Sequence, residues 1–272
     1  MPRSRRRAKR ILTRANTERH ALYERAVQSA DIDADLIENI FRREMGRRPR
    51  TLREDFCGTA WLCAEWVKRG ADRKAVGIDL DAGVLAWGKA KHIDPLGEDA
   101  KRVKLVRANV LKPPAGTFDA ICAYNYSYFC FRDRDTLRSY FETAKRSLVP
   151  GGLLFLDAFG GSNAQEVQTE TRRCRGYTYK WEQVRFNPID HDFLAHIHFE
   201  FDDGSAWKRA FTYSWRLWQL PEIQELLREA GFRSVDVYWE DEDKRGKGLG
   251  TFRKRKIAPA DATWNAYIVA KR

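Results

Sequence analysis

The residues best suited to chemistry lie between Thr51 and Asp81, in the stretch TLREDFCGTAWLCAEWVKRGADRKAVGIDLD. Small residues surround Gly58, and Asp79 stands 21 positions later. A glycine-containing turn before a helix lets backbone N–H groups approach a ligand, and a carboxylate at the tip of the next parallel strand can accept both ribose hydroxyls. This spacing predicts a nucleoside-containing cofactor. Because Gly58 is the one glycine in the turn, a dinucleotide fingerprint is missing, and a purely structural turn remains an alternative.

Strands and helices must alternate along the chain to place these residues at one edge of a sheet. Apolar segments separated by amphipathic helical patterns predict a parallel sheet with right-handed crossovers and ligands at the carboxyl ends of its strands. We expect helices over 20–28, 33–44, 60–69, 82–91, 134–147 and 221–230. We expect sheet strands over 51–55, 74–80, 103–107, 118–123, 153–158, 235–239 and 264–270, the last two joined by a charged loop.

The pattern changes between about residues 161 and 217. Period-two segments over 177–186, 193–201 and 205–215 are separated by turn signals such as Asp202-Asp203-Gly204. Such alternation predicts antiparallel strands. Aromatic residues are frequent here, among them Trp181, Trp207 and Trp215. We interpret the segment as an antiparallel insertion that covers the sheet as a lid.

Charge is concentrated at the N-terminus of this 272-residue chain, whose formal net charge is +12. Residues 1–19 hold eight Lys/Arg and one acidic residue. We expect a basic, disordered arm over 1–19 and a single domain over 20–272, and weak non-specific RNA contact through residues 3–10 remains an alternative to a solvated arm. The five cysteines form no Cys-x-x-Cys pair, and neither a signal peptide nor a membrane span is evident, so we expect a cytoplasmic protein.

Four motifs in order resemble class I S-adenosylmethionine-dependent methyltransferases over about residues 52–272. Glu54 to Ala60 is similar to the family's first motif, and Gly77-Ile78-Asp79-Leu80 resembles its ribose-binding motif. Asn109 stands where the family usually places an aspartate beside the adenine, and Pro150-Gly151-Gly152 is typical before strand five. The resemblance implies a seven-stranded, mostly parallel Rossmann-like methyltransferase sheet with helices on both faces.

The resemblance also implies that S-adenosylmethionine is the cofactor and S-adenosylhomocysteine the product. The lid after strand five is similar to that of methyltransferases acting on small amines or hydroxy compounds. The resemblance assigns cofactor binding to Glu54, Gly58, Thr59, Asp79 and Asn109, and we expect their neighbours Phe56, Cys57, Leu80 and Val110 and the strand-four residue Tyr124 to contribute. Tyr23 on the predicted N-terminal helix could close over the amino-acid end of the cofactor, and packing of that helix remains an alternative role for it.

The acceptor should lie near the residues that leave strand four, Tyr124 to Tyr128. A methyl group on a sulfonium is already activated, so the enzyme needs in-line positioning and exclusion of water. We expect Asn125 to orient the acceptor and Tyr128 to contact it. Among His191, His196 and His198, a general base is plausible, and we choose His191. His196 and His198 share one face of a strand, but we expect no metal site.

Other functions fit parts of the same pattern. RNA or a protein is the rival methyl acceptor. A Rossmann-type NAD(P)-dependent oxidoreductase would share the first 160 residues but should have more glycines in its first turn. A non-enzymatic nucleic-acid-binding protein would explain the basic arm and would leave Glu54, Asp79 and Asn109 without a role. The sequence does not indicate an oligomeric state.

Overall fold

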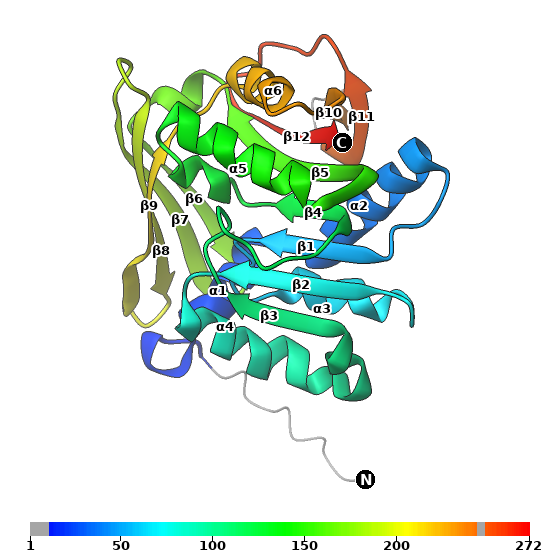
Figure 1. The fold of residues 1–272 in the computed structure, drawn as a ribbon. Coiled ribbons are helices and arrows are strands. Elements are labelled where there is room, and N and C mark those ends of the chain that lie inside the picture. The colour runs from blue at the N-terminus through cyan, green and yellow to red at the C-terminus, as the bar shows by residue number, and fades with distance from the viewer. Residues whose placement is uncertain (1–10, 244–247) are drawn as a thin grey trace.

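Five strands form the parallel centre of the main sheet in the computed structural model, which describes residues 11–243 and 248–272. They are β1 (Thr51–Asp55), β2 (Lys74–Asp79), β3 (Val103–Arg107), β4 (Phe118–Ala123) and β5 (Leu148–Gly160). The antiparallel neighbours β12 (Trp264–Lys271), β10 (Ser234–Glu242) and β11 (Gly248–Arg255) extend the sheet beyond β5. The order is β11-β10-β12-β5-β4-β1-β2-β3, which confirms the predicted mostly parallel α/β fold (Figure 1).

The number of strands was predicted incorrectly, because this sheet has eight strands among the described residues and not seven. The additional strand, β11, forms within the segment that we expected to be a charged loop. Its side chains pair with β10, since Arg253 and Arg255 each lie 2.7 Å from the Asp241 carboxylate. An edge strand with charged, exposed side chains shows no apolar alternation, so its sequence resembles a loop.

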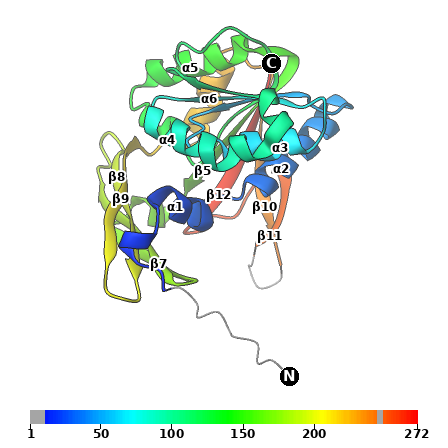
Figure 2. The same ribbon diagram turned by 90° about the horizontal axis from the view of Figure 1, so that it is seen from below.

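Helices cover both faces of the main sheet (Figure 2). On one face, α2 (Ala30–Met45), α3 (Trp61–Lys68) and α4 (Ala82–Gly88) bury apolar side chains, with a π-helical turn (Lys89–Ile93) extending α4. On the other face, α5 (Arg134–Arg146) and α6 (Leu220–Glu229) do the same. These helices match the periodicity of the sequence.

Side-chain hydrogen bonds cap the N-termini of two of these helices. The Asp81 carboxylate accepts hydrogen bonds from the backbone N–H groups of Gly83 (2.7 Å) and Val84 (3.2 Å) and so caps α4. Asp133 caps α5 in the same way. Such caps satisfy N–H groups that a helix leaves unpaired and fix where it begins. The first residues of α4 are thereby held beside Asp79.

The insertion forms a second sheet at the carboxyl ends of the parallel strands (Figure 1). Its antiparallel strands are β6 (Gln168–Cys174), β7 (Tyr177–Phe186), β8 (Asp192–Phe201) and β9 (Ala206–Arg216). The three strands that we expected are present. We did not expect β6, because its mostly exposed and polar residues carry no alternation.

Helix α1 (Arg19–Val27) lies between the two sheets (Figure 2). Leu22 and Ala26 pack against Ile197 and Phe199 of the lid. Part of the predicted arm also contacts the lid: the Arg14 backbone N–H donates to the Ser205 hydroxyl (3.0 Å). Residues 1–10, with the RNA contact considered for 3–10, lie outside the described residues.

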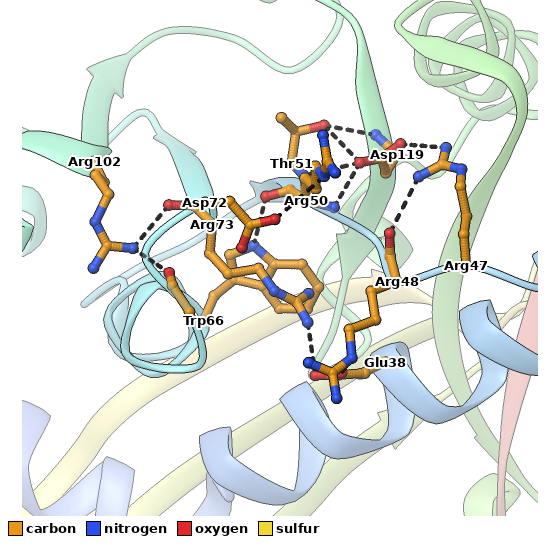
Figure 3. Close-up of polar contacts among 11 residues, drawn as sticks. Glu38, Arg47, Arg48, Arg50, Thr51, Trp66, Asp72, Arg73, Arg102 and Asp119 are labelled. Atoms are coloured by element: carbon orange, nitrogen blue, oxygen red, sulfur yellow. Dashed lines mark hydrogen bonds and ion pairs between the residues drawn. The ribbon is translucent and has the colours of Figure 1, made fainter.

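Arginines at the opposite, amino-terminal edge of the sheet have structural partners (Figure 3). The buried Asp119 carboxylate accepts backbone hydrogen bonds from Arg50 (2.6 Å) and Thr51 (3.0 Å) and pairs with Arg47 (2.6 Å). The Arg73 guanidinium pairs with Glu38 at 2.9 Å. Within the described residues, no helix combines the length and apolar character needed to cross a membrane.

Candidate active site

The turn between β1 and α3 has an unusual backbone. Phe56, Gly58 and Ala60 all have positive φ angles, of 57°, 52° and 55°. Left-handed conformations cost L-residues with a side chain about 1–2 kcal/mol, so the surroundings must hold Phe56 and Ala60 in place. A Cβ atom on Gly58 would meet no heavy atom within 4 Å, so the backbone is open to a ligand there.

Two glycines outside the turn allow its neighbours to approach closely. A Cβ atom on Gly77 of β2 would lie 2.8 Å from the Cys57 sulfur. A Cβ atom on Gly88 at the end of α4 would lie 2.1 Å from the Thr59 carbonyl oxygen. The turn is thus packed directly against β2 and α4, and only glycine fits at both contacts.

Asp79 is fixed at the carboxyl end of β2 by the turn itself. One carboxylate oxygen accepts the Gly58 backbone N–H at 2.8 Å, and the other accepts the Asp81 N–H at 2.9 Å. Each oxygen keeps lone-pair capacity for a further donor. Leu80, the next residue, is 62% exposed and presents an apolar surface beside the carboxylate. This arrangement suits a ribose and the base attached to it.

Asn109 follows β3 at the same edge of the sheet. Its side-chain oxygen accepts the Leu111 backbone N–H at 2.9 Å, which orients the amide. That oxygen can accept a second hydrogen bond. The neighbouring Val110 is buried.

Glu54 lies at the end of β1 and points toward α3. Its carboxylate accepts hydrogen bonds from the backbone N–H (3.2 Å) and the thiol (3.1 Å) of Cys63. Burial is the largest cause that raises the pKa of Glu54 to about 8. The nearby Thr59 hydroxyl is buried and has no hydrogen-bond partner among the described residues.

The chain leaves β4 through two consecutive left-handed residues, Asn125 (φ 57°) and Tyr126 (φ 56°). The Asp157 carboxylate on β5 accepts the backbone N–H of both, at 2.7 and 2.9 Å. Tyr124 precedes them with a buried phenol that has no hydrogen-bond partner in the described chain. Burial is also the main reason that the pKa of Asp157 rises to about 7.

A cavity of about 410 Å³ lies between the lid, α1 and the ends of β4 and β5. Asn125 and Tyr126 line it from the main sheet. Aromatic side chains from the lid and from β5 form much of its wall, namely Phe159, Tyr179, Trp181, Tyr213 and Trp215. Tyr23 lines it from α1, and its ring lies 4.9 Å from the Phe211 ring of the lid. The cavity therefore adjoins the edge that carries Asp79 and Glu54.

Helix α1 also contacts α4 and the π-helical turn that extends it. The His92 Nε2 atom lies 2.6 Å from the Glu24 carboxylate. The rings of His20 and Trp87 lie 5.4 Å apart. The Arg172 guanidinium of the lid also donates to the Ala26 carbonyl oxygen near the end of α1. One helix therefore bridges α4 and the lid.

Two expected acceptor residues do not line this cavity. Tyr128 is fully buried, and its hydroxyl donates to the Asp157 carbonyl oxygen at 2.7 Å. His191 lies in the β7–β8 turn with its Nδ1 atom 3.1 Å from the Leu217 carbonyl oxygen. Neither side chain is placed to contact an acceptor in the cavity, so we retain neither as a catalytic candidate.

His196 and His198 do not line the cavity either. They alternate with the cavity-lining Ile197 on β8, so they lie on the opposite face of the lid. His196 contacts the Thr212 hydroxyl at 2.9 Å, and burial lowers its pKa. His198 pairs with Glu182 at 2.9 Å. No cluster of three or more potential metal ligands occurs among the described residues.

The sequence did not single out several residues that the fold brings to the site. Asp157 is the clearest case, and its acidic position at the end of a parallel strand was a usable signal. Asp33 at the start of α2 and Tyr267 on β12 are others: the Tyr267 hydroxyl donates to the Asp33 carboxylate at 3.4 Å. These two residues are 234 positions apart, and no local pattern joins them.

The fixed Asp79 carboxylate, the open Gly58 backbone and the unpaired hydroxyls of Thr59 and Tyr124 fit a ligand that combines a nucleoside with a charged, polar tail. Comparison with known proteins agrees. Residues 56–152 match a family described as "Methyltransferase domain". No curated protein matches the sequence significantly.

Many solved structures share this fold. An S-adenosylmethionine-dependent methyltransferase from Clostridium acetobutylicum has a TM-score of 0.68 at 17% identity, covering 93% of this chain and 96% of that chain. An amino pentose methyltransferase from Micromonospora echinaspora has a TM-score of 0.65 at 16% identity, with coverages of 93% and 95%. A sugar N-methyltransferase from Streptoalloteichus has a TM-score of 0.62 at 17% identity, with coverages of 99% and 97%.

The overall fold and the matched segment 56–152 together indicate the class of protein. Residues 56–152 match a methyltransferase domain, and the chain has the fold of S-adenosylmethionine-dependent methyltransferases. Two of the structures with this fold, the amino pentose methyltransferase and a glycopeptide N-methyltransferase, contain bound S-adenosylmethionine.

Proposed function

We propose that the protein transfers the methyl group of S-adenosylmethionine to a nitrogen or oxygen nucleophile of a small-molecule acceptor by in-line displacement. The cavity of about 410 Å³ carries this proposal, because it adjoins the cofactor edge and Asn125 and Tyr126 line it there. Its volume is typical of small-ligand pockets. An extended RNA or a protein surface would instead need an open groove.

The eleven residues that we expect from the sequence to bind the cofactor remain our proposal for its site. Asp79 would hold the ribose hydroxyls, and Asn109, Leu80 and Val110 would surround the adenine. The turn from Phe56 to Thr59, with Glu54 beneath it, would face the rest of the cofactor. Tyr23 and Tyr124 would lie toward the acceptor.

The side chains of the cavity favour an amine as the acceptor. Aromatic walls attract cations and exclude water from the reacting atoms. Glu170 on β6 lines the cavity, and within the described chain its carboxylate has no ion-pair partner. Arg172 is the one basic residue among the described lining, and it is occupied by the Ala26 carbonyl oxygen and the Tyr179 ring. An acceptor with a positive charge would therefore meet an uncompensated carboxylate.

Asn125 is our candidate for orienting the acceptor. It lines the cavity, and its side chain makes no hydrogen bond to another described residue. An amide can donate to or accept from a nucleophile or a neighbouring hydroxyl. Because the methyl group is already activated, holding the nucleophile in line is the main task of the protein.

The acceptor class is tested with methyl-labelled S-adenosylmethionine and three separate pools: metabolites below about 1 kDa, total RNA, and protein. We expect label to appear in the metabolite pool, in a fraction retained by cation exchange. An Asp79→Ala variant gives the background. Label that appears only in RNA or only in protein would refute the small-molecule proposal.

The Glu170→Gln substitution tests whether the acceptor is a cationic amine or a neutral compound. We expect this variant to raise the KM of a cationic acceptor about tenfold, the scale of one charge interaction at a partly exposed site, and to leave neutral hydroxyl acceptors unchanged. Glu166→Gln is the matched control, because Glu166 precedes β6 and does not line the cavity. Equal effects of the two substitutions would contradict an amine-binding role for Glu170.

A further inference from the structure

Most acidic side chains buried in the described chain have an arginine partner. The Asp55 carboxylate lies 2.9 Å from the guanidinium of Arg53, and both side chains are fully buried. Asp119 pairs with Arg47 at 2.6 Å. Asp192 pairs with an arginine in the lid. A buried carboxylate without such a partner is costly, because it loses hydration without a compensating charge.

In the part of the chain that the structure describes, three carboxyl groups at the cofactor edge lack an arginine partner; Glu54 is buried, and Asp33 and Asp157 are half-buried. Asp33 accepts a hydrogen bond from Tyr267, Glu54 accepts two from Cys63, and Asp157 accepts two from backbone N–H groups. Among the described residues, none of the three has an ion-pair partner. They come from α2, β1 and β5, so only the tertiary fold brings them together.

Strand pairing brings the three groups near one another. Tyr267, whose hydroxyl donates to Asp33, is the direct cross-strand partner of Asp157, and Glu54 is joined to β5 through Cys122 of β4. The charge of Asp33 raises the pKa of both Glu54 and Asp157, in addition to the larger effect of burial. Burial likewise raises the pKa of Asp33, to about 7.

The Tyr124 ring lies 5.6 Å from the Tyr267 ring, so its side chain with the buried, unpartnered hydroxyl is next to the residue that links Asp33 and Asp157. Burial raises the pKa of Tyr124, and the charges of Asp33 and Asp157 add to this effect.

No basic side chain forms an ion pair with these three carboxyl groups within the described chain. Arg69 packs on α2 near Asp33, but it pairs with Asp35 and donates to the Asp31 carbonyl oxygen. The titratable groups with the largest electrostatic interactions with the three carboxyl groups are acidic, phenolic or thiol groups, namely Tyr23, Asp31, Cys57, Cys63, Asp79, Cys122, Tyr124, Tyr126, Tyr128 and Tyr267. The site therefore lacks positive charge of its own, and a cationic ligand would supply it.

We propose that Asp33, Glu54 and Asp157 form an anionic cluster that binds cationic S-adenosylmethionine in preference to its neutral product, S-adenosylhomocysteine. The two ligands differ by the sulfonium methyl group and one unit of positive charge. When the methyl group leaves, the electron pair of the broken S–C bond stays on sulfur, so the attraction to the cluster weakens. The protein thus discriminates against its own product by charge, independently of the acceptor's identity.

Isothermal titration calorimetry of both ligands tests the proposal without any acceptor. For the wild-type protein, we expect the ratio of the Kd of S-adenosylhomocysteine to that of S-adenosylmethionine to increase at least about fivefold from pH 6 to pH 8, as the cluster ionises. Titrations in buffers of different ionisation enthalpy should show that S-adenosylmethionine releases more protons at pH 7. An equal ratio at both pH values together with equal proton release would overturn the proposal.

Substitutions of individual carboxyl groups then test which of them discriminate between the two ligands. Asp33→Asn should lower the affinity ratio at pH 8 about fivefold or more, and Glu54→Gln provides a second, independent variant if the first does not fold. Asp119→Asn is the matched control, because it perturbs a buried carboxylate that also accepts two backbone N–H groups but lies at the opposite edge of the sheet (Figure 3). We expect the control to leave the ratio within about twofold. If Asp33→Asn and Glu54→Gln weaken both ligands equally, the cluster does not discriminate.

Discussion

Gly88 of α4 packs against the turn between β1 and α3, which we propose contacts the cofactor. Substituting Gly88 therefore tests how α4 supports this turn. The Cβ position of Gly88 lies 2.1 Å from the Thr59 carbonyl oxygen and 2.6 Å from the Thr59 carbonyl carbon, whereas ordinary contacts begin at 3.4 Å. Both obstructing atoms belong to the backbone and cannot rotate away. Gly88→Ala therefore requires the helix and the turn to separate by about 1.3 Å.

The expected magnitude combines two opposing effects. Alanine in a helix is favoured over glycine by about 0.8–1 kcal/mol, and Gly88 has helical φ and ψ angles of −63° and −39°. Forcing an additional methyl group into a packed contact costs about 1–3 kcal/mol. We expect the free energy of unfolding to fall by up to about 2 kcal/mol. Because Thr59 belongs to the turn, we also expect the Kd of S-adenosylhomocysteine to rise at least about tenfold.

Gly83→Ala in the same helix is the matched control. The nearest atom to its Cβ position is a carboxylate oxygen of the Asp81 side chain at 3.1 Å, with no backbone atom within 4 Å. This substitution should leave affinity within about twofold and stability unchanged or slightly higher. Urea unfolding and calorimetry measure both quantities. If Gly88→Ala binds S-adenosylhomocysteine as tightly as Gly83→Ala does, the turn does not depend on this contact, and our reasoning is wrong.

Three further predictions concern the cofactor, the lid and pH. Asp79→Ala should weaken S-adenosylhomocysteine binding by about 1.5–3 kcal/mol, and undiminished affinity by calorimetry in a folded variant would refute the ribose role. Trp181→Ala should lower kcat/KM for the acceptor found by labelling while the cofactor Kd changes less than about threefold; equal losses would indicate a purely structural tryptophan. The pKa of Glu54 is raised to about 8, so the native state holds this proton more tightly than the unfolded state does. Unfolding experiments on the cofactor-free protein should therefore show stability falling as pH rises from about 5 through 8, and Glu54→Gln should flatten that dependence.

The sequence alone predicted the helices and parallel strands of the main sheet and indicated a nucleoside site. Periodicity located its helices and parallel strands, and a glycine turn followed 21 positions later by Asp79 indicated a nucleoside site, because both depend on local geometry. The structure joins these two residues by a hydrogen bond of 2.8 Å. The sequence did not predict the charged, exposed strands β6 and β11. Neither strand buries one of its faces, so neither shows an alternation of apolar and polar residues.

Tertiary structure alone decided which side chains surround the acceptor cavity. Tyr126 and Tyr128 leave the same strand two residues apart, yet the first lines the cavity and the second is fully buried. The left-handed turn at Asn125 and Tyr126 is held by Asp157, which is 31 positions from Tyr126. The sequence equally could not place His191, which a turn of the lid holds beside Leu217. The directions of these side chains depend on packing against residues far away in the sequence. They therefore cannot be predicted from a local pattern of residue types.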